Sequence, residues 1–251
     1  MNTPRRRTRL LHTSDVHLGT SHLAREELAF ERFVDLAVAE QVDAVIIAGD
    51  LFDHSRVNDD LMEWTAAQLD RLPCPAVLHT GNHDQLDDHS VYHRFKPEVR
   101  CRDVVFIDDF DGQVIEVPGT DVTVWGRAMF EHEPSFRPVA AVPERPGDRW
   151  AIIVAHGLMM DDENPTYRSS PIYPSDFHGL DWDYVALGHV HAHRIYRLGS
   201  MTACYPGATA YSVKGEPGAV LVDLQEGRHV ELTWRPLATP AVEAPISPPV
   251  P

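Results

Sequence analysis

The sequence predicts an α/β fold, because short β-branched apolar runs alternate with amphipathic helical patterns over the first third of the chain. The run Ala44–Ala48 is apolar throughout, as in a strand that is buried on both faces. Gly49 and Asp50 follow it directly, so a carboxylate stands at the end of the strand. Open α/β sheets gather their ligand sites at such carboxyl ends. We therefore expect the functional site at the carboxyl ends of the strands.

The N-terminal third predicts the order strand, helix, strand, helix, strand, which favours parallel pairing through right-handed crossovers. The first helix, from about Arg25 to Gln41, spaces its apolar residues as an amphipathic helix does. Asn58 is a suitable N-cap for the second helix, with acidic residues in its first turn, and Pro73 ends it. The strands are expected at residues 9–14, 44–48 and 76–80.

The rest of the chain alternates strands with turn signals such as Asp111-Gly112 and Pro118-Gly119. An antiparallel meander is expected over residues 104–107, 113–117 and 121–125. Two buried strands are expected at 150–155 and 184–187, followed by a second antiparallel set at 201–205, 219–224 and 230–235. The segments 131–148 and 160–178 are rich in proline and polar residues and are expected to be loops.

A single domain is expected over residues 1–236, because 251 residues suffice for one large core and no linker interrupts the pattern. Recurrent prolines predict an extended or disordered tail over residues 237–251. No apolar run approaches the roughly 18 residues that a membrane span needs. Three widely separated cysteines favour a reducing compartment over a disulfide framework. These features predict a cytoplasmic protein that does not bind membranes.

The charge balance is acidic, with 38 Asp and Glu against 22 Lys and Arg and a net charge of −16. Such a surface disfavours binding of a long polyanion unless basic residues cluster locally. The chain also contains 15 histidines. Neutral imidazole is the commonest transition-metal ligand, so this content is compatible with a metal site without establishing one.

Five expected strand ends carry a carboxylate, an amide oxygen or an imidazole, and most of them neighbour a glycine. A single histidine at a strand end is usually structural, but an ordered set of five such motifs favours a shared site. The mixture of oxygen and nitrogen donors suits Mn²⁺, Fe²⁺ or Zn²⁺ better than Mg²⁺ or Ca²⁺. The motifs are Asp15-x-His17, Asp50-x-x-Asp53, Asn82-His83-Asp84, His156 and His189-x-His191.

In this order the motifs resemble the calcineurin-like metallophosphoesterase superfamily, whose pattern D-x-H, G-D-x-x-D, G-N-H-[DE], H and G-H-x-H is matched at every element. The segments Thr13–Gly19, Ala48–Asp53 and Tyr205–Gly207 look most like the SbcD-type DNA-repair exonuclease branch. The resemblance implies a four-layer α/β fold, in which two mixed β-sheets pack as a sandwich flanked by helices.

The resemblance also implies two divalent transition-metal ions, with Mn²⁺ expected and Fe²⁺ or Zn²⁺ as alternatives. A hydroxide held between them would attack phosphorus in line. His83 would protonate the leaving group, and Asp53 would orient His83. One ion would be held by Asp15, His17, Asp50 and His191, and the other by Asp50, Asn82, His156 and His189.

The expected function is therefore a two-metal phosphodiesterase of exonuclease-like ancestry, acting on DNA, a nucleotide or another phosphoester. Arg56 and His193 are candidate phosphate-binding residues, and Arg194 beside His193 could also touch a phosphate. The alternatives are a surface salt bridge for Arg56 and a solvated loop for the other two. An ATPase partner is implied by the resemblance alone, and a homodimer is left open. SbcD-type chains usually continue into a DNA-capping region, whereas a Pro-rich stretch follows here, so we expect a compact, freestanding enzyme.

Two other functions are weighed against this one. The first is a phosphomonoesterase, or a phosphodiesterase of cyclic nucleotides or other small molecules. The second is a non-catalytic scaffold with the same fold. Scaffolds of this superfamily typically lose metal ligands or the catalytic histidine, whereas the sequence keeps all seven ligands and His83. This favours an enzyme.

Overall fold

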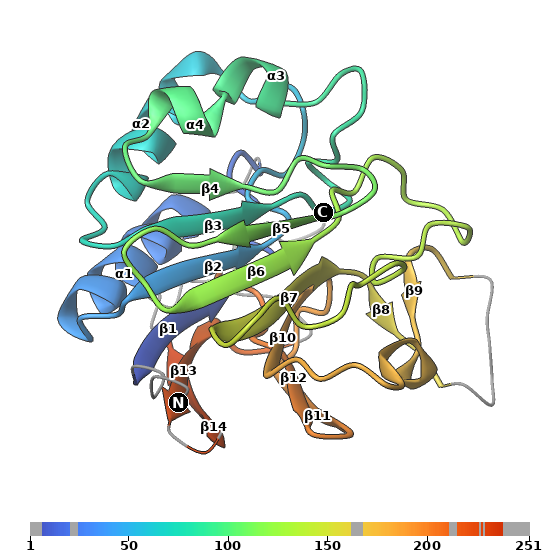
Figure 1. Ribbon diagram of the computed structural model, residues 1–251. Coiled ribbons are helices and arrows are strands. Elements are labelled where there is room, and N and C mark those ends of the chain that lie inside the picture. The colour runs from blue at the N-terminus through green and yellow to red at the C-terminus, as the bar shows by residue number, and fades with distance from the viewer. Residues whose placement is uncertain are drawn as a thin grey trace, which may run out of the picture.

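The computed structural model describes residues 7–20, 25–161, 168–210, 215–225, 227 and 229–237. They form two six-stranded mixed sheets that pack against each other over a shared apolar core (Figure 1). The predicted sandwich of two mixed sheets is thus confirmed. In spatial order, the first sheet contains β14 (His229–Pro236), β13 (Gly218–Gln225), β1 (Thr8–Thr13), β2 (Ala44–Ala48), β3 (Ala76–His79) and β4 (Val104–Phe106).

The second sheet also mixes parallel and antiparallel pairs. At its centre β10 pairs in parallel with β7 on one side and with β12 on the other. In spatial order, it contains β11 (Arg194–Leu198), β12 (Met201–Tyr205), β10 (Tyr184–Gly188), β7 (Trp150–His156), β6 (Val122–Gly126) and β5 (Gln113–Glu116).

Two crossover helices, α1 (Arg25–Ala39) and α2 (Asp59–Leu69), cover the face of the first sheet that points away from the second (Figure 1). The alternation along β2 explains this layering, because successive side chains of a strand point to opposite faces. Val45 and Ile47 pack with the helices, whereas Ile46 and Ala48 lie in the core between the sheets. The predicted cap of α2 is present, since Asn58 Oδ1 accepts a hydrogen bond from the Leu61 N–H at 2.8 Å.

The outer face of the second sheet is covered differently. Its apolar side chains, such as Ile153 and Val185, pack against Val139, Phe177 and Trp182. These covering residues lie in irregular segments and in a short 3₁₀ helix, η1 (Pro174–Phe177). The predicted flanking by helices therefore holds for the first sheet, while connecting segments close the second.

The distribution of strands between the sheets differs from the sequence prediction. The predicted antiparallel meander is wrong for β4, which pairs in parallel with β3, while β5 and β6 form an antiparallel pair in the other sheet. The predicted second antiparallel set is wrong for β12, since only β13 and β14 of that set pair together. Strand β11 was not expected, because exposed arginines interrupt its apolar pattern.

The expected loop at residues 160–178 contains more structure than predicted. Strand β9 (Pro171–Ile172) pairs with β8 (Leu158–Met159), and η1 follows directly. Two four-residue helices, α3 (Tyr92–Phe95) and α4 (Pro97–Arg100), precede β4. The expected tail falls almost wholly outside the described residues, as do residues 1–6. Among the described helices, none combines the length and apolar character that a bilayer span requires.

Candidate metal centre and active site

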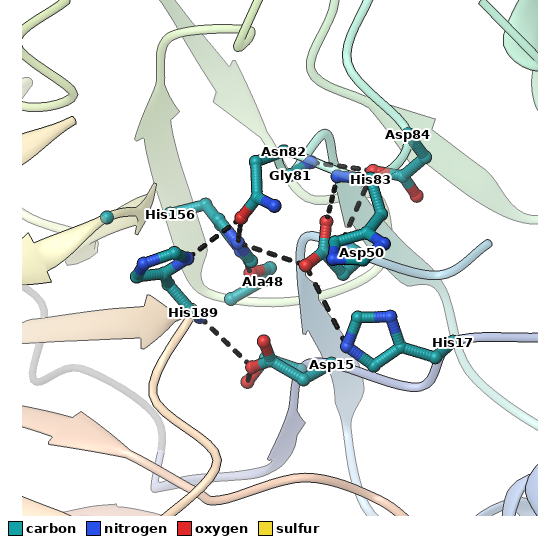
Figure 2. Close-up of polar contacts among 12 residues, drawn as sticks. Asp15, His17, Ala48, Asp50, Gly81, Asn82, His83, Asp84, His156 and His189 are labelled. Atoms are coloured by element: carbon teal, nitrogen blue, oxygen red, sulfur yellow. Dashed lines mark hydrogen bonds and ion pairs between the residues drawn. The ribbon is translucent and has the colours of Figure 1, made fainter. Parts of the chain in front are cut away.

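The five sequence motifs meet where the two sheets come together at the carboxyl ends of their parallel strands (Figure 2). The ends of β1, β2 and β3 supply the first three motifs, and the ends of β7 and β10 supply the other two. The contact between the sheets is direct, because His156 Nδ1 lies 2.8 Å from the Ala48 carbonyl oxygen. All seven predicted metal-binding residues are brought into this one region. Their role as ligands stays a prediction.

The backbone turns sharply at the positions that supply these side chains. Asp15, His17, Asp50 and His189 have positive φ angles of 54°, 55°, 54° and 99°. Side-chain-bearing residues rarely adopt this region, which costs about 1–3 kcal/mol at each position and is concentrated at functional sites. The surrounding packing therefore holds these residues in conformations that aim their side chains at a common point.

Glycines permit the close approach of the chain segments. A Cβ atom at Gly81 would overlap the Asp50 carboxylate, and one at Gly188 would overlap the Ala48 carbonyl group. Any larger residue would push the loops after β3 and β10 away from the end of β2. The glycines beside the motifs are thus needed for the convergence itself.

One group of candidate ligands contains Asp15, His17 and His191, whose ligand atoms lie within 4.8 Å of one another. The Nε2 atoms of the two histidines are 3.2 Å apart, and His191 Nε2 is 3.4 Å from Asp15 Oδ1. Asp50 Oδ2 lies 3.9 Å from His17 Nε2. Neighbouring ligands of one ion at about 2.1 Å are separated by similar distances.

The second group surrounds His156, which is fully buried. Its Nδ1–H donates to the Ala48 carbonyl, so Nε2 faces Asp50 Oδ2 at 3.3 Å and Asn82 Oδ1 at 3.2 Å with a lone pair. His189 Nδ1 is 2.8 Å from the same Asn82 oxygen. Asp50 is shared by the two groups, as Figure 2 shows.

The electrostatics of the site fit a bound cation. Asp15 Oδ1 is buried and accepts no properly oriented hydrogen bond from the described residues, and two oxygens face the His156 lone pair. Burial alone would raise the pKa of Asp50, but the nearby imidazoles, His156 above all, bring it well below its ordinary value. Burial opposes charge on His156, yet Asp50 and Asp15 raise its pKa to about 9. In the metal-free protein, protonated His156 thus supplies the positive charge that a metal ion would otherwise provide to the two carboxylates.

His83 lies beside these groups, with its ring centroid 4.6 Å from that of His17. Its Nδ1 is 2.9 Å from the Asp53 carbonyl oxygen and 3.2 Å from Asp53 Oδ1. Because both partners are acceptors, Nδ1 carries the proton and Nε2 is left for another partner. Asp53 Oδ1 is also 3.0 Å from His17 Nδ1, so one carboxylate orients both a candidate ligand and the candidate acid. The His83 side chain is 43% exposed, as contact with a substrate requires.

Asp84 ties the loops after β2 and β3 together. Its Oδ1 accepts from the backbone N–H groups of Gly81 at 2.7 Å and Asp50 at 3.2 Å. Its Oδ2 accepts from Phe52 N–H at 3.1 Å and from the Tyr92 hydroxyl at 2.8 Å. This buried carboxylate faces backbone and a hydroxyl, and it helps to fix the position of Asp50.

The candidate phosphate-binding residues Arg56 and His193 lie outside the cluster. Arg56 is exposed, and its backbone N–H donates to His54 Nδ1. His193 is also exposed, and its Nδ1–H donates to the Tyr205 carbonyl. Their role in binding substrate stays a prediction.

Sequence patterns missed His132, whose ring centroid lies 5.5 Å from that of His189. It belongs to a Pro-rich connection rather than a strand end, so no motif marks it. His132 lines a cleft of about 760 Å³, the basic cleft, which we define by His132, Arg168, Ser169 and Arg194 together with the candidate ligands His189 and His191.

A second hollow of about 250 Å³ shares His191 in its lining with the basic cleft. We call it the acidic hollow and define it by Asp15, His17, Glu26, Asp53, His83 and His191. The candidate acid His83 thus opens into this hollow, whereas His132 opens into the basic cleft.

Comparison with known proteins agrees with this geometry. A model of the family described as calcineurin-like phosphoesterase matches residues 8–193. The SbcD component of the nuclease SbcCD from Bacillus subtilis is 29% identical and aligns with 90% of this chain and 68% of its own length. The DNA double-strand break repair protein Mre11 from Methanosarcina mazei is 27% identical, over 93% of this chain and 39% of its own. An uncharacterised metallophosphoesterase of B. subtilis, YhaO, is 26% identical over 93% of this chain and 63% of its own.

Solved structures share the fold at low sequence identity. The protein TT1561 of Thermus thermophilus superposes with a TM-score of 0.62 at 16% identity, covering 94% of this chain and all of that one. A structure described as an archaeal phosphodiesterase gives a TM-score of 0.51 at 16% identity, over 90% of this chain and 99% of that one. The chain therefore spans whole structural neighbours but, for two of the three sequence relatives above, less than two thirds of their length.

Proposed function

This chain belongs to the calcineurin-like phosphoesterase family and is a metal-dependent phosphoester hydrolase, and from that premise we propose that it is a two-metal phosphodiesterase. The observation that carries the proposal is the position of Asp50 between the two groups of candidate ligands. A carboxylate in that position suits a pair of ions held close together. When bound, such a pair would activate water and neutralise charge on the phosphate.

The residues around the site would bind the metal ions, protonate the leaving group and bind the substrate. Asp15, His17, Asp50 and His191 would hold one ion, and Asp50, Asn82, His156 and His189 would hold the other. His83 would deliver a proton from Nε2 to the departing oxygen, since its Nδ1–H is held by Asp53. Hydrolysis then breaks one phosphoester bond, consumes one water and yields an alcohol and a phosphate monoester. The basic cleft would receive the rest of the substrate.

We further propose Mn²⁺ as the working ion and a nucleic-acid or nucleotide diester as the substrate. The donor set of carboxylate, amide and imidazole supports Mn²⁺, with Fe²⁺ and Zn²⁺ as alternatives. The substrate class is supported by the relatives named as part of a nuclease and as a DNA repair protein. An ATPase partner belongs to the same proposal and rests on the resemblance of the sequence motifs alone, while a homodimer is left open.

The test is hydrolysis of bis-p-nitrophenyl phosphate by metal-stripped protein to which Mn²⁺ is restored. We expect release of p-nitrophenol that is abolished by chelation and by Asp50→Asn, which replaces the carboxylate shared by both groups of candidate ligands with a neutral amide. Hydrolysis of the monoester p-nitrophenyl phosphate alone would instead establish a phosphatase. Inactivity on both esters, in protein that binds Mn²⁺, would favour the scaffold.

A further inference from the structure

The two hollows that meet at His191 carry opposite charge. Among the described residues that line the basic cleft, two are arginines, three are histidines and none is acidic. The acidic hollow contains Glu26 and Asp53, together with Asp15, which the proposed function assigns to a metal ion, and no arginine or lysine among its described residues. In a chain of net charge −16, the described lining of this cleft thus consists of basic and neutral side chains.

The basic cleft is suited to phosphate. Arg168 and Arg194 offer guanidinium groups, which bind phosphate oxygens through paired, charge-assisted hydrogen bonds. Ser169 adds a hydroxyl to the same wall. His132 is held by Ser170, whose Oγ lies 3.0 Å from its Nδ1. A volume of about 760 Å³ falls within the roughly 300–1,000 Å³ of small-molecule sites, so the cleft accommodates a nucleotide-sized group.

The part of the acidic hollow around Glu26 and Asp53, away from the proposed metal ligands, is suited to a group without negative charge. Glu26 Oε2 is buried and accepts no hydrogen bond from any residue that the structure describes. Asp53 adds a second carboxylate. A phosphate placed beside them would be repelled at short range. His83, the proposed proton donor to the leaving oxygen, opens into this hollow, and the leaving alcohol therefore lies on this side.

We propose that Arg168 and Arg194 form a subsite for a second phosphate group of the substrate. This phosphate belongs to the nucleoside that stays bonded to the scissile phosphorus after hydrolysis. The uncharged leaving alcohol departs into the acidic hollow. This inference rests on the proposed phosphodiesterase function and adds a substrate class, namely a nucleotide diester with a further phosphate on the retained nucleoside. It also explains how an acidic protein binds a substrate with several negative charges, because two arginines line one cleft that has no described carboxylate.

Two substrates that differ by one phosphate test the subsite. Both are p-nitrophenyl esters of thymidine 5′-phosphate, and one also carries a 3′-phosphate on the retained nucleoside. We expect the 3′-phosphate to lower KM by roughly tenfold or more in the wild-type protein, because two guanidinium groups meet it. The double variant Arg168→Ala/Arg194→Ala should bring the ratio of the two KM values close to one.

Arg197→Ala is the matched control, since Arg197 lies on β11 with Arg194 but bonds to Thr202 and does not line the cleft. It should keep the wild-type ratio. A wild-type ratio near one, or a full ratio in the double variant, would overturn the subsite. A third substrate, in which a second thymidine esterifies the 3′-phosphate, shows which kind of phosphate the subsite takes. An unchanged KM indicates a phosphate within a nucleic-acid strand, and a raised KM indicates a terminal phosphate.

Failure of the subsite is distinguishable from failure of the proposed function. Turnover of bis-p-nitrophenyl phosphate, which has no second phosphate, reports on the phosphodiesterase alone. If none of the esters is hydrolysed, the subsite is read from calorimetric binding of thymidine 3′,5′-bisphosphate to Mn²⁺-loaded protein. Binding that is lost in the double variant and kept in Arg197→Ala supports the subsite, and equal binding by all three proteins contradicts it.

Discussion

His83 and Asn82 are neighbours in the chain but face different partners. Asn82 Oδ1 points to His156 and His189 (Figure 2). The His83 ring packs edge to face on His17, and its Nδ1 is held by Asp53. His83 also lies near His17 and Asp50 in a group whose ligand atoms are mutually within 4.8 Å. Distance therefore permits two roles for His83, as an acid or as a ligand, and metal content separates them.

The His83→Ala variant should lower kcat by roughly 10²–10⁴-fold, the range typical for removal of a general acid. Its bound metal, measured by elemental analysis after gel filtration, should equal that of the wild type. His89→Ala removes an exposed histidine from the same loop region and should change neither quantity. Loss of metal together with activity in His83→Ala would assign His83 as a ligand.

At the scale of elements, the short helix α3 stabilises the loops that carry the site through a hydrogen bond from Tyr92 to Asp84. Tyr92 packs on Phe106 at 4.6 Å between ring centroids and donates its hydroxyl to Asp84, which in turn accepts three backbone N–H groups from the loops after β2 and β3. Burial and the charge on Asp50 raise the pKa of Asp84 to about 6. The carboxylate therefore depends on all of its donors to stay ionised in the interior.

Removing the hydroxyl in Tyr92→Phe should destabilise the protein by about 1–2 kcal/mol, because a buried carboxylate loses a charge-assisted hydrogen bond while the ring packing is kept. The free energy of unfolding in urea measures the change. Tyr196→Phe on β11 deletes a hydroxyl from the second sheet and should cost far less. Equal stabilities of Tyr92→Phe and the wild type would show that Asp84 does not need this donor.

At the scale of the whole molecule, buried histidines make folding sensitive to acid. His79 is 1% exposed, and burial, reinforced by the charge on His156, lowers its pKa to about 4 from an ordinary value of 6.5. The folded state keeps His79 neutral at pH values where the unfolded chain already binds a proton. Its contribution to stability is therefore complete above pH 6.5 and is lost as the pH falls toward 4.

The pKa difference of about 2.5, at about 1.36 kcal/mol for each pKa unit, sets a ceiling of about 3 kcal/mol, of which about 2 kcal/mol is lost between pH 7 and pH 5. Urea unfolding of chelator-treated protein at these two pH values should show the loss, and His79→Gln should reduce it by that amount. His89→Gln, at an exposed position, should leave the difference unchanged. An identical pH response in His79→Gln would exclude His79 as the source.

The sequence by itself determined the local structure and the candidate ligands. Strand β2, helix α1 and the Asn58 cap were predicted within a few residues, because periodicity and capping depend on neighbours in the chain. The strand-end motifs were found for the same reason, and the resemblance to the metallophosphoesterase pattern then singled out the seven candidate ligands within them. Only the tertiary structure decided which sheet receives β4 and β12, because strand pairing depends on contacts that no local pattern encodes.

The charge of the two hollows was likewise decided by the tertiary structure. His132, Arg168 and Arg194 are separated by tens of residues, and the sequence pointed only to Arg194, beside the last motif, as a candidate phosphate contact. They line one cleft because the start of β11 and the connections before β7 and β9 all lie near the carboxyl end of β10. Proximity across the fold, rather than spacing along the chain, thus determines where the positive charge lies.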